Sequence, residues 1–283
     1  MVSKSSVLAA LYLCNCAVIT KSPYEYIVTK TYGERVELEL EERQTLDSNY
    51  RKAQWMIDYD ALGWVSTDTL MARLGHQIDT GKLGGWVIFD STAYYGKLEA
   101  GLFKIYYEFD FRNKEHFFKE NRVPTEKPKV TKLALAQEKA MDLFKEDRGN
   151  NYEKINPCAR IEGMYVDVYL IPAHTNKYYV LGGGWFSRWD SETLQLVKKR
   201  KLHEAAYPVE RSNDDLGLHW SSKSNAVLNE VDLFQAFRLK KRFNLQAITT
   251  NKYIFTHEGL SRGFQFDVFG TRFLEDQIKK RKK

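Results

Sequence analysis

The sequence has few cysteines and no long hydrophobic run, and each shortage excludes a class of protein. Only three of its 283 residues are cysteine, and two of them, Cys14 and Cys16, lie in an apolar N-terminal stretch. If that stretch is removed, Cys158 is the one thiol left, which rules out an intramolecular disulfide framework. The apolar stretch, SSVLAALYLCNCAVIT at residues 5–20, is shorter than the roughly 20 apolar residues of a membrane-spanning helix.

The excess of positive over negative charge is also small. The chain has 43 Lys and Arg against 37 Asp and Glu, a formal net charge of +6, and part of this excess lies in the basic tail 279–283. A nucleic-acid-binding protein is expected to carry a basic stripe with interleaved aromatic residues, so nucleic acid is not an expected partner. The 43% hydrophobic and 14% aromatic residues are enough to form a core.

A common phosphate-binding motif is missing as well. The glycines at 182–184 are not followed by Lys and Ser or Thr, nor by a predicted helix, so they do not form a phosphate-binding loop. They suggest a β-bulge or a close approach of two backbone segments instead. Cys158 has no histidine near it in the sequence. A nucleophilic cysteine would need a histidine supplied by the fold.

The N-terminus is typical of an exported protein. A short basic lead, MVSK, precedes the apolar run at 5–20, as in the first two regions of a secretory signal. We therefore expect residues 1–22 to be a signal segment and the protein to be periplasmic or secreted. No small-x-small pair lies cleanly before Lys21, and the residues before the two N-terminal cysteines are not the small ones of a lipoprotein. A buried N-terminal strand or helix is the alternative.

The hydrophobic pattern predicts an α+β fold in two parts. The first part, residues 23–118, is a small α+β unit with a helix over 44–58 and a short helix from Ser66 or Thr67 to Gly75. From there GGWVIFD and GKLEAGLFKIYYEFDF alternate with period two, which predicts antiparallel strands. The two parts are expected to meet in a charged segment with two prolines, KENRVPTEKPKV, which spans residues 119–130.

The second part, residues 130–283 with the basic tail, mixes helices and strands. It begins with an amphipathic helix, KVTKLALAQEKAMDLFKED. Strands follow in MYVDVYLIPA, YYVLGGGWFSRWD, TLQLVKKRKL and LGLHW, then a helix over 230–241 and a strand LQAITTNKYIFT that turns at His257. This order favours a three-layer α/β core.

One stretch, LHWSSKSNAVLNEVD at 218–232, resembles a metal site. A catalytic zinc needs three protein ligands and an open position for water. The stretch is similar to the H-x-H, seven residues, S-x-x-D pattern of the JAMM (MPN-type) metalloproteases, with His219 at the first histidine and Asp232 at the aspartate. The resemblance covers roughly residues 130–260. It implies the α/β fold of that family, with a zinc ion between strand and helix.

The ligand set that the resemblance implies is incomplete. Ser221 replaces the second histidine, and Asn229 replaces the serine that would stabilise an oxyanion. Glu162 lies at a suitable place in the chain for the catalytic glutamate. Glu162 and Asn229 are thus the candidate catalytic residues, and His219 and Asp232 are the remains of a metal site. Two ligands are too few for a catalytic zinc.

Each of these residues also has a structural interpretation. Asn229 is a good N-cap, and Asp232 in the first turn of a helix is stabilised by roughly 0.3–1 kcal/mol through the helix dipole. His219 at a strand end can be hydrogen-bonded to backbone or to a carboxylate. His203 and His257 could replace the missing ligand, but we expect both at the surface.

The C-terminal half is also similar to a group of uncharacterised exported bacterial proteins, on the segments VYLIPA, LGGGWFSRWD, EVDLFQAFRL and ITTNKYIFT. Together the observations predict a non-catalytic binding or accessory protein of the bacterial cell envelope, a pseudoenzyme that acts through protein–protein contacts without a cofactor. After signal removal it would have no integral membrane domain. Two alternatives stay open. One is a divergent zinc metallohydrolase, with His219 and Asp232 as ligands and Glu162 as base. The other is a periplasmic immunity or inhibitor protein.

Overall fold

The structure is a computed structural model that describes most of the chain between residues 32 and 271. The described residues are 32–75, 80–112, 117–148, 155–173, 178–203, 206–210, 217–222, 226–239, 243, 245–258 and 266–271. The expected signal segment 1–22, the basic tail 279–283 and the histidines at 76, 116 and 174 lie outside these residues. Within them the fold is mixed α+β with antiparallel sheets, which confirms the predicted fold class at this level.

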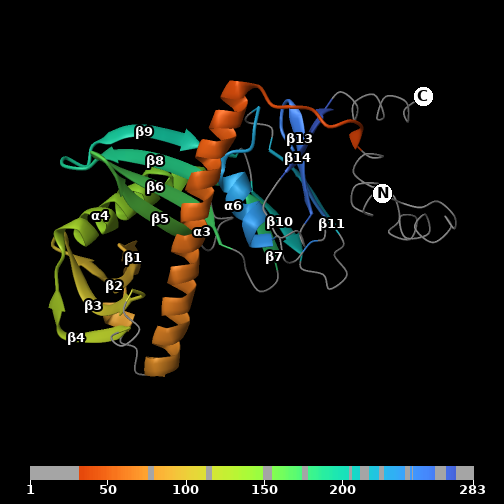
Figure 1. The fold of residues 1–283 in the computed structure, drawn as a ribbon. Helices are drawn as coiled ribbons and strands as arrows, with labels where there is room; N and C mark the ends of the chain where they lie inside the picture. The colour runs from red at the N-terminus through yellow and green to blue at the C-terminus, as the bar shows by residue number, and fades with distance from the viewer. Residues whose placement is uncertain are drawn as a thin grey trace.

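A long helix, α3 (Leu40–Leu74), runs through the centre of the described structure (Figure 1). Figure 1 shows it between two groups of elements, with β1–β6, β8, β9 and α4 on one side and α6 with the remaining strands on the other. The helix begins where the Glu42 carboxylate accepts the N–H of Glu39 at 3.1 Å. It ends at Gly75, whose φ of 48° is a backbone conformation that glycine adopts at little cost. None of the described helices is both long and apolar enough to span a membrane.

The structure merges two predicted helices into this one. The sequence predicted separate helices over 44–58 and from Ser66 to Gly75. Ser66 is not a cap but a fully buried residue inside α3. Its hydroxyl donates to the carbonyl of Leu62 at 2.7 Å and contacts the Tyr95 hydroxyl at 2.8 Å. A serine can remain inside a helix because its hydroxyl bonds back to the preceding turn, so its presence did not mark a boundary.

The N-terminal sheet has the strand order β1-β2-β3-β4, and all neighbours are antiparallel. Its strands are β1 (Gly85–Phe89), β2 (Thr92–Glu99), β3 (Leu102–Asp110) and β4 (Phe118–Thr125). The turns Asp90–Ser91 and Ala100–Gly101 have positive φ at both residues, as two-residue hairpin turns require. The antiparallel strands predicted from the period-two pattern are confirmed.

Residues 119–130 are mostly exposed, as the sequence predicted, but they are not an irregular linker. Most of them form β4, in which Phe118 pairs with Phe109 of β3. Both prolines fit this arrangement. Pro124 lies on an edge strand, where a missing N–H costs little, and Pro128 is the first residue of α4, where the N–H has no helical partner.

Helix α4 packs between this sheet and the next one. The helices and the turn of this region are η2 (Thr80–Lys82), α4 (Pro128–Leu143) and α5 (Lys145–Arg148). The predicted apolar face of α4 is confirmed, since Leu133, Ala136 and Ala140 are fully buried. They share one core cluster with Val87 and Ile105 of the N-terminal sheet and with residues of the second sheet. The core is therefore continuous across the predicted boundary.

The second sheet has the antiparallel order β5-β6-β8-β9, and β7 leaves it to pair with β10. The strands are β5 (Ile155–Glu162), β6 (Tyr165–Pro172), β7 (Tyr178–Gly182), β8 (Trp185–Asp190), β9 (Leu196–Lys201) and β10 (Ala206–Glu210). The chain crosses from one sheet to the other at Gly183, where a Cβ would lie 2.6 Å from the Ala206 Cβ. The close backbone approach predicted from the three glycines is confirmed.

The third sheet has the order β11-β12-β13-β14. Its strands are β11 (Gly217–Ser221), β12 (Leu245–Thr249), β13 (Tyr253–Glu258) and β14 (Asp267–Gly270). Strands β11 and β12 are parallel, and α6 (Glu230–Leu239) lies between them in the chain. The predicted strand LQAITTNKYIFT is in fact a hairpin. It turns where the Thr250 hydroxyl accepts the N–H of Tyr253 at 3.0 Å.

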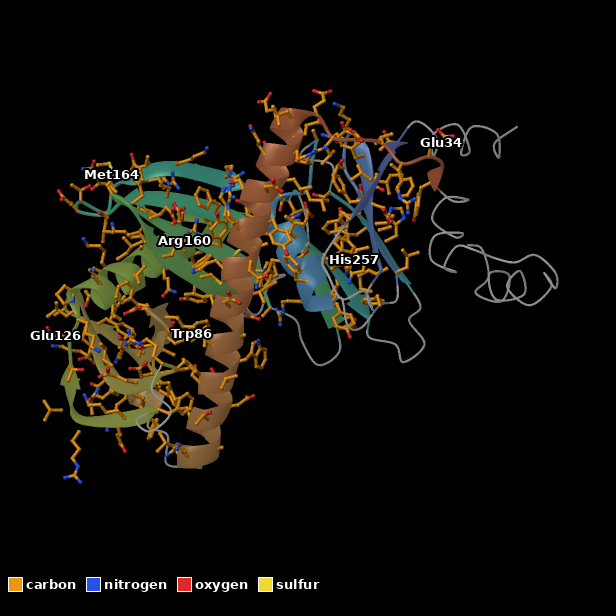
Figure 2. The ribbon with its side chains drawn as sticks, in the orientation of Figure 1. Glu34, Trp86, Glu126, Arg160, Met164 and His257 are labelled. Carbon is orange, nitrogen blue, oxygen red and sulfur yellow. The ribbon has the colours of Figure 1, made fainter. Side chains whose placement is uncertain are left out.

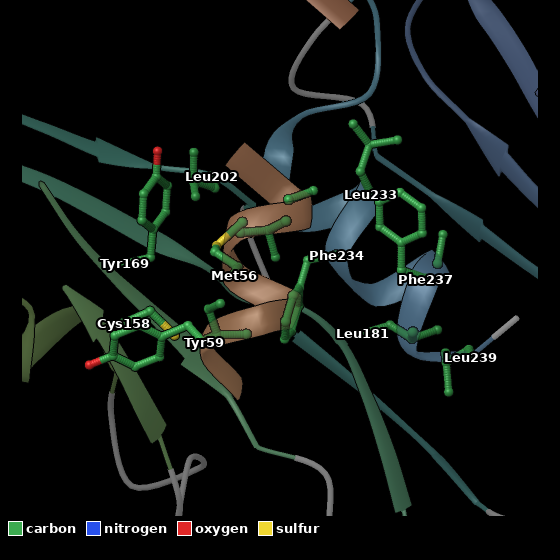
Figure 3. Packing of buried hydrophobic residues seen from close by; sticks show 14 of the residues in the cluster. Met56, Tyr59, Cys158, Tyr169, Leu181, Leu202, Leu233, Phe234, Phe237 and Leu239 are labelled. Carbon is green, nitrogen blue, oxygen red and sulfur yellow. The ribbon is translucent and has the colours of Figure 1, made fainter. Parts of the chain in front are cut away.

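The largest core cluster joins α3, α6 and all three main sheets. Figure 3 shows Met56 of α3 between Tyr169 of β6 and Phe234 of α6. All three side chains are at least 98% buried. Helix α6 is buried along nearly its whole length, so it packs as a central element rather than as a surface helix.

A polar clasp holds the third sheet against the start of α3. Lys252, in the β12–β13 turn, lies 2.9 Å from the Glu39 carboxylate and 2.8 Å from that of Glu42. The Tyr253 hydroxyl donates to Glu42 at 2.6 Å. Desolvation raises the pKa of Glu42, but the hydrogen bonds from Lys252, Tyr253 and the Glu39 backbone outweigh it and hold the pKa below its usual value.

This clasp makes stability depend on pH. A carboxyl whose folded pKa is depressed stabilises the fold above its unfolded pKa, and this contribution is lost as the pH falls through the folded value. Glu42→Gln is expected to destabilise the protein by about 1 kcal/mol at pH 7 and progressively less below about pH 4.5. Thermal unfolding at several pH values measures this, with the exposed neighbour Glu41→Gln as control. A difference that does not shrink at low pH contradicts it.

Candidate functional site

The start of α6 carries two of the residues that the sequence analysis singled out. Asn229 caps the helix, because its Oδ1 accepts the N–H of Val231 at 2.9 Å and of Asp232 at 3.0 Å. The side chain satisfies two backbone donors that have no partner in the helix itself. The structural interpretation of Asn229 as an N-cap is confirmed.

Asp232 is fully buried and surrounded by donors. Its Oδ2 accepts the Ser222 hydroxyl at 2.6 Å and the backbone N–H of Asn229 at 3.1 Å. Its Oδ1 lies 2.9 Å from Nε2 of His203. We refer to His203, Ser222, Asn229 and Asp232 as the Asp232 cluster. It joins the residues that follow β9 and β11 to the first turn of α6.

His203 is buried, with 6% of its surface exposed, so its predicted surface position is wrong. Its basic neighbours in KRKLHEAA suggested solvent, but the strand carries the ring inward next to α6. Nδ1 lies 3.5 Å from the N–H of Gly184, and a ring nitrogen that accepts a hydrogen bond carries no proton. Nε2 faces the Asp232 carboxylate, which can only accept a hydrogen bond, and also lies 3.3 Å from the side-chain nitrogen of Asn229.

The order of contacts in the Asp232 cluster does not suit nucleophilic catalysis. In a catalytic triad the histidine lies between the nucleophile and the carboxylate, so that it can take the nucleophile's proton. Here Ser222 and His203 both bind the carboxylate. The serine proton points at Asp232, and all four side chains are more than 90% buried. The cluster fixes the start of α6.

His219 is the middle residue of β11 and not the last residue that the sequence had predicted, and its partners differ from those of Asp232. Its Nε2 is 2.7 Å from the Thr249 hydroxyl of the adjacent strand, and its ring meets the edge of Tyr32. Loss of hydration in this position lowers the pKa of His219. Among the described residues no hydrogen bond or ion pair joins His219 to Asp232. Nor do any three His, Cys, Asp or Glu side chains in that part of the chain form a group able to hold a metal.

Glu162 lies away from both residues. It forms an ion pair with Arg160 at 3.2 Å, and 53% of its side chain is exposed. Figure 2 shows Arg160 on one side of α3 and His257, which shares a sheet with His219, on the other. The structure thus does not bring the candidate base to the candidate ligands.

Two further residues with side chains that could take part in catalysis or metal binding, His257 and Cys158, are buried in the core. His257 is fully buried in β13, so the surface turn predicted there is wrong, and the strand continues through it. Cys158 is buried in the main core, and burial raises the pKa of its thiol well above the usual value. A nucleophilic cysteine needs the opposite shift, so Cys158 is a core residue.

Comparison with protein-family models, with curated proteins and with solved structures finds no match to this chain.

Next to the Asp232 cluster lies a partly buried charge pair that the sequence did not reveal. Glu230 is fully buried, and its Oε1 accepts hydrogen bonds from Arg200 of β9 and, at 3.2 Å, from the hydroxyl of Tyr169. Arg200 and Asn229 also line an open groove of about 570 Å³ along the first turns of α3. Periodicity could not reveal this pair, because Arg200 lies in a basic strand, KKRK, that is typical of a solvated sheet edge.

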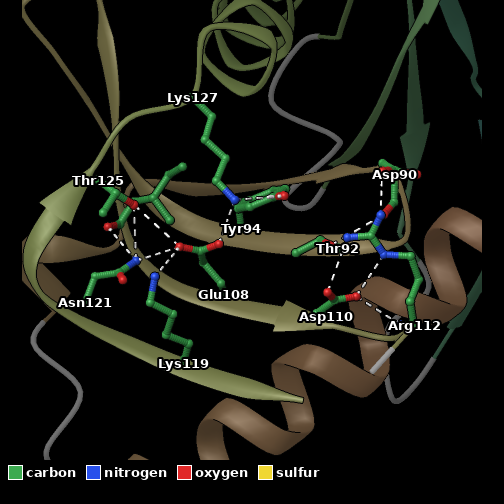
Figure 4. A network of polar contacts seen from close by, with 11 residues as sticks. Asp90, Thr92, Tyr94, Glu108, Asp110, Arg112, Lys119, Asn121, Thr125 and Lys127 are labelled. Atoms are coloured by element: carbon green, nitrogen blue, oxygen red, sulfur yellow. Dashed lines mark hydrogen bonds and ion pairs between the residues drawn. The ribbon is translucent and has the colours of Figure 1, made fainter. Parts of the chain in front are cut away.

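A second polar network lies in the N-terminal sheet (Figure 4). Glu108 of β3 accepts hydrogen bonds from Lys127 at 2.8 Å and from Asn121 at 2.9 Å, and Lys119 lies 3.5 Å away. Burial raises the pKa of Glu108, but these donors lower it more. The network attaches the start of α4 to the sheet. Its carboxylate is held by donors on several sides, which is the pattern of a structural ion pair.

Proposed function

We propose that this protein is a non-catalytic binding or accessory protein of the bacterial cell envelope, periplasmic or secreted, that acts through protein–protein contacts. One observation carries the non-catalytic part. Asp232, the carboxylate that a JAMM-type zinc would need, is fully buried and accepts hydrogen bonds from Ser222, from the Asn229 backbone and from His203. To bind a metal it would have to give up hydrogen bonds worth about 1.5–3 kcal/mol each to a charged group.

The same proposal treats β11, α6 and β12 as a three-layer α/β core of JAMM type that has lost its metal site. Three features support it: His219 lies in a strand, Asp232 lies in the first turn of the following helix, and the next strand returns parallel to the first. Folds often keep a site's framework after the chemistry has gone. The envelope location rests on the basic lead and the apolar run at 5–20.

The proposal is tested by metal content and peptide cleavage. The purified full chain, incubated with excess Zn²⁺ and desalted, is expected to retain far less than one zinc per chain and to leave a mixed peptide library intact. His219→Ala is expected to behave identically, because no group of His, Cys, Asp or Glu that could hold a metal forms around His219 among the described residues. Stoichiometric zinc together with cleavage, both lost in His219→Ala, would overturn the proposal and favour a zinc peptidase.

A further inference from the structure

The C-terminal half of α3 exposes apolar side chains in one continuous stripe. Trp64 and Val65 are each 51% exposed and Met71 is 56% exposed. With Ile57 and Ala61 they recur at spacings of three, four and seven residues, which places them on one side of the helix. We call these five residues the α3 stripe.

The stripe continues the side of α3 that binds α6. Upstream, Tyr50 packs against Phe237 of α6 with ring centroids 5.3 Å apart. Near the end of α6, Arg238 reaches Asp60 at 3.4 Å. Beyond this level α3 continues to Leu74. Figure 1 shows the N-terminal sheet on one side of this part of α3 and no described helix or strand on the other. The helix-binding face of α3 is therefore longer than the helix that occupies it.

The uncovered length suits a further helix. From Ala61 to Met71 the axis rises about 15 Å, roughly three turns. Large apolar groups at this spacing, with a tryptophan at the centre, are typical of an anchor surface for an amphipathic helix. Single exposed apolar residues need no explanation, but an aligned set marks a contact site.

The charges beside the stripe indicate which kind of partner helix could bind there. Asp58 and Asp68 are exposed, and no ion pair to either carboxylate is found among the described residues. The nearby cations on described elements face elsewhere: Arg73 lies over the Phe118 ring at 4.9 Å, and Arg238 pairs with Asp60. A second copy of α3 would bring its own Asp58 and Asp68 to the same surface, and like charges at an interface are unfavourable.

We propose that the α3 stripe is the docking site for an amphipathic helix of a partner protein, with one apolar face flanked by Lys or Arg. This inference rests on the proposed binding function and names the surface and the partner class. The apolar face would cover Trp64 and Met71, and the flanking cations would pair with Asp58 and Asp68.

The test uses the full chain and two model peptides of about 14 residues. Both carry leucines at helical spacing, and one has lysines and the other glutamates at the flanks. The lysine peptide is expected to bind wild type at least 10-fold more tightly than the glutamate peptide in titration calorimetry. Trp64→Ser with Met71→Ser is expected to weaken lysine-peptide binding at least 10-fold, and Asp58→Lys with Asp68→Lys to reverse the preference.

The matched control is Val123→Ser, which removes a more exposed apolar residue, 78% accessible, from β4, away from the stripe. It is expected to bind like wild type, and all variants change exposed positions, so unchanged thermal unfolding confirms that they fold. Equal affinity of both peptides, or binding indifferent to the stripe variants, would overturn the proposal. So would dimerisation of the chain that Trp64→Ser abolishes.

A second measurement separates this proposal from the proposed function. A photo-crosslinking residue at position 64 or at position 123 is introduced into the protein in its native cells. Crosslinks at 64, with the partner segment identified as a basic amphipathic helix, support the docking site. Crosslinks to a partner at 123 and none at 64 would overturn the docking site and leave the binding function standing. Zinc-dependent cleavage would overturn the function instead.

Discussion

Replacing Asp232 with alanine is expected to lower the free energy of unfolding by about 3–5 kcal/mol. The carboxylate is fully buried and binds His203, Ser222 and the Asn229 backbone. Its removal leaves these donors buried without an acceptor, and each such group costs about 1–3 kcal/mol. The helix start also loses a favourable negative charge. In thermal unfolding this corresponds to a fall in Tm of about 10 °C.

Asp232→Asn is expected to lose less, about 1–2 kcal/mol, because the amide keeps one oxygen acceptor in the same place. Asp267→Ala is the control. Asp267 pairs with Arg35 at 2.7 Å but is partly exposed, and surface ion pairs contribute about 0–1 kcal/mol. If Asp232→Ala were as stable as wild type or more so, Asp232 would be a functional residue kept at a cost to stability. The non-catalytic proposal would then lose its main support.

Replacing Gly183 with alanine is expected to destabilise the protein by about 2–5 kcal/mol, through two separate effects. Gly183 has a φ of 70°, and a side chain in the left-handed region costs roughly 1–2 kcal/mol. The new Cβ would lie 2.6 Å from the Cβ of Ala206 and 3.1 Å from Pro172, and overpacking of this kind costs about 1–3 kcal/mol.

Gly163→Ala separates the two effects. Gly163 has a similar φ of 60°, with nothing within 4 Å of the added carbon, so only the backbone cost of roughly 1–2 kcal/mol applies. Ala206→Gly combined with Gly183→Ala removes the nearest clashing atom and is expected to restore part of the lost stability, measured as a double-mutant cycle. Equal losses at Gly163 and Gly183, with no rescue, would show that the crossing between the two sheets is not tightly packed.

The candidate site was predictable only in its local parts. Asn229 as a helix cap follows from residue type and position, since the first backbone donors of any helix need acceptors. The burial of His203 does not follow from its neighbours. KRKLHEAA is strongly basic, and only the pairing of β9 with β8 and the packing of α6 bring the ring to Asp232. Arg200 and Glu230 are 30 residues apart in the chain, so their hydrogen bond too depends on how distant segments pack together.

The strands show the same division. The period-two pattern located β2 and β3, because alternation follows from strand geometry alone. The prolines of KENRVPTEKPKV suggested a linker, because proline lacks the N–H that a central strand needs. The fold places Pro124 on a sheet edge and Pro128 at a helix start, where that donor is not needed. The local sequence does not show which strand will lie at the edge of a sheet, because the strand order is set by the whole fold.

Local sequence features were enough to predict the α+β class, the antiparallel hairpins, the apolar face of α4 and the cap at Asn229, and they left a β-bulge or a close approach open at Gly183. Each depends on interactions within a few residues or on the conformational range of one residue. Only the tertiary structure decided that α3 is one helix, that Asp232 is enclosed by His203 and Ser222, and that Trp64 and Met71 remain uncovered. These features depend on which distant segments meet, and that is set by how all the apolar faces are buried together.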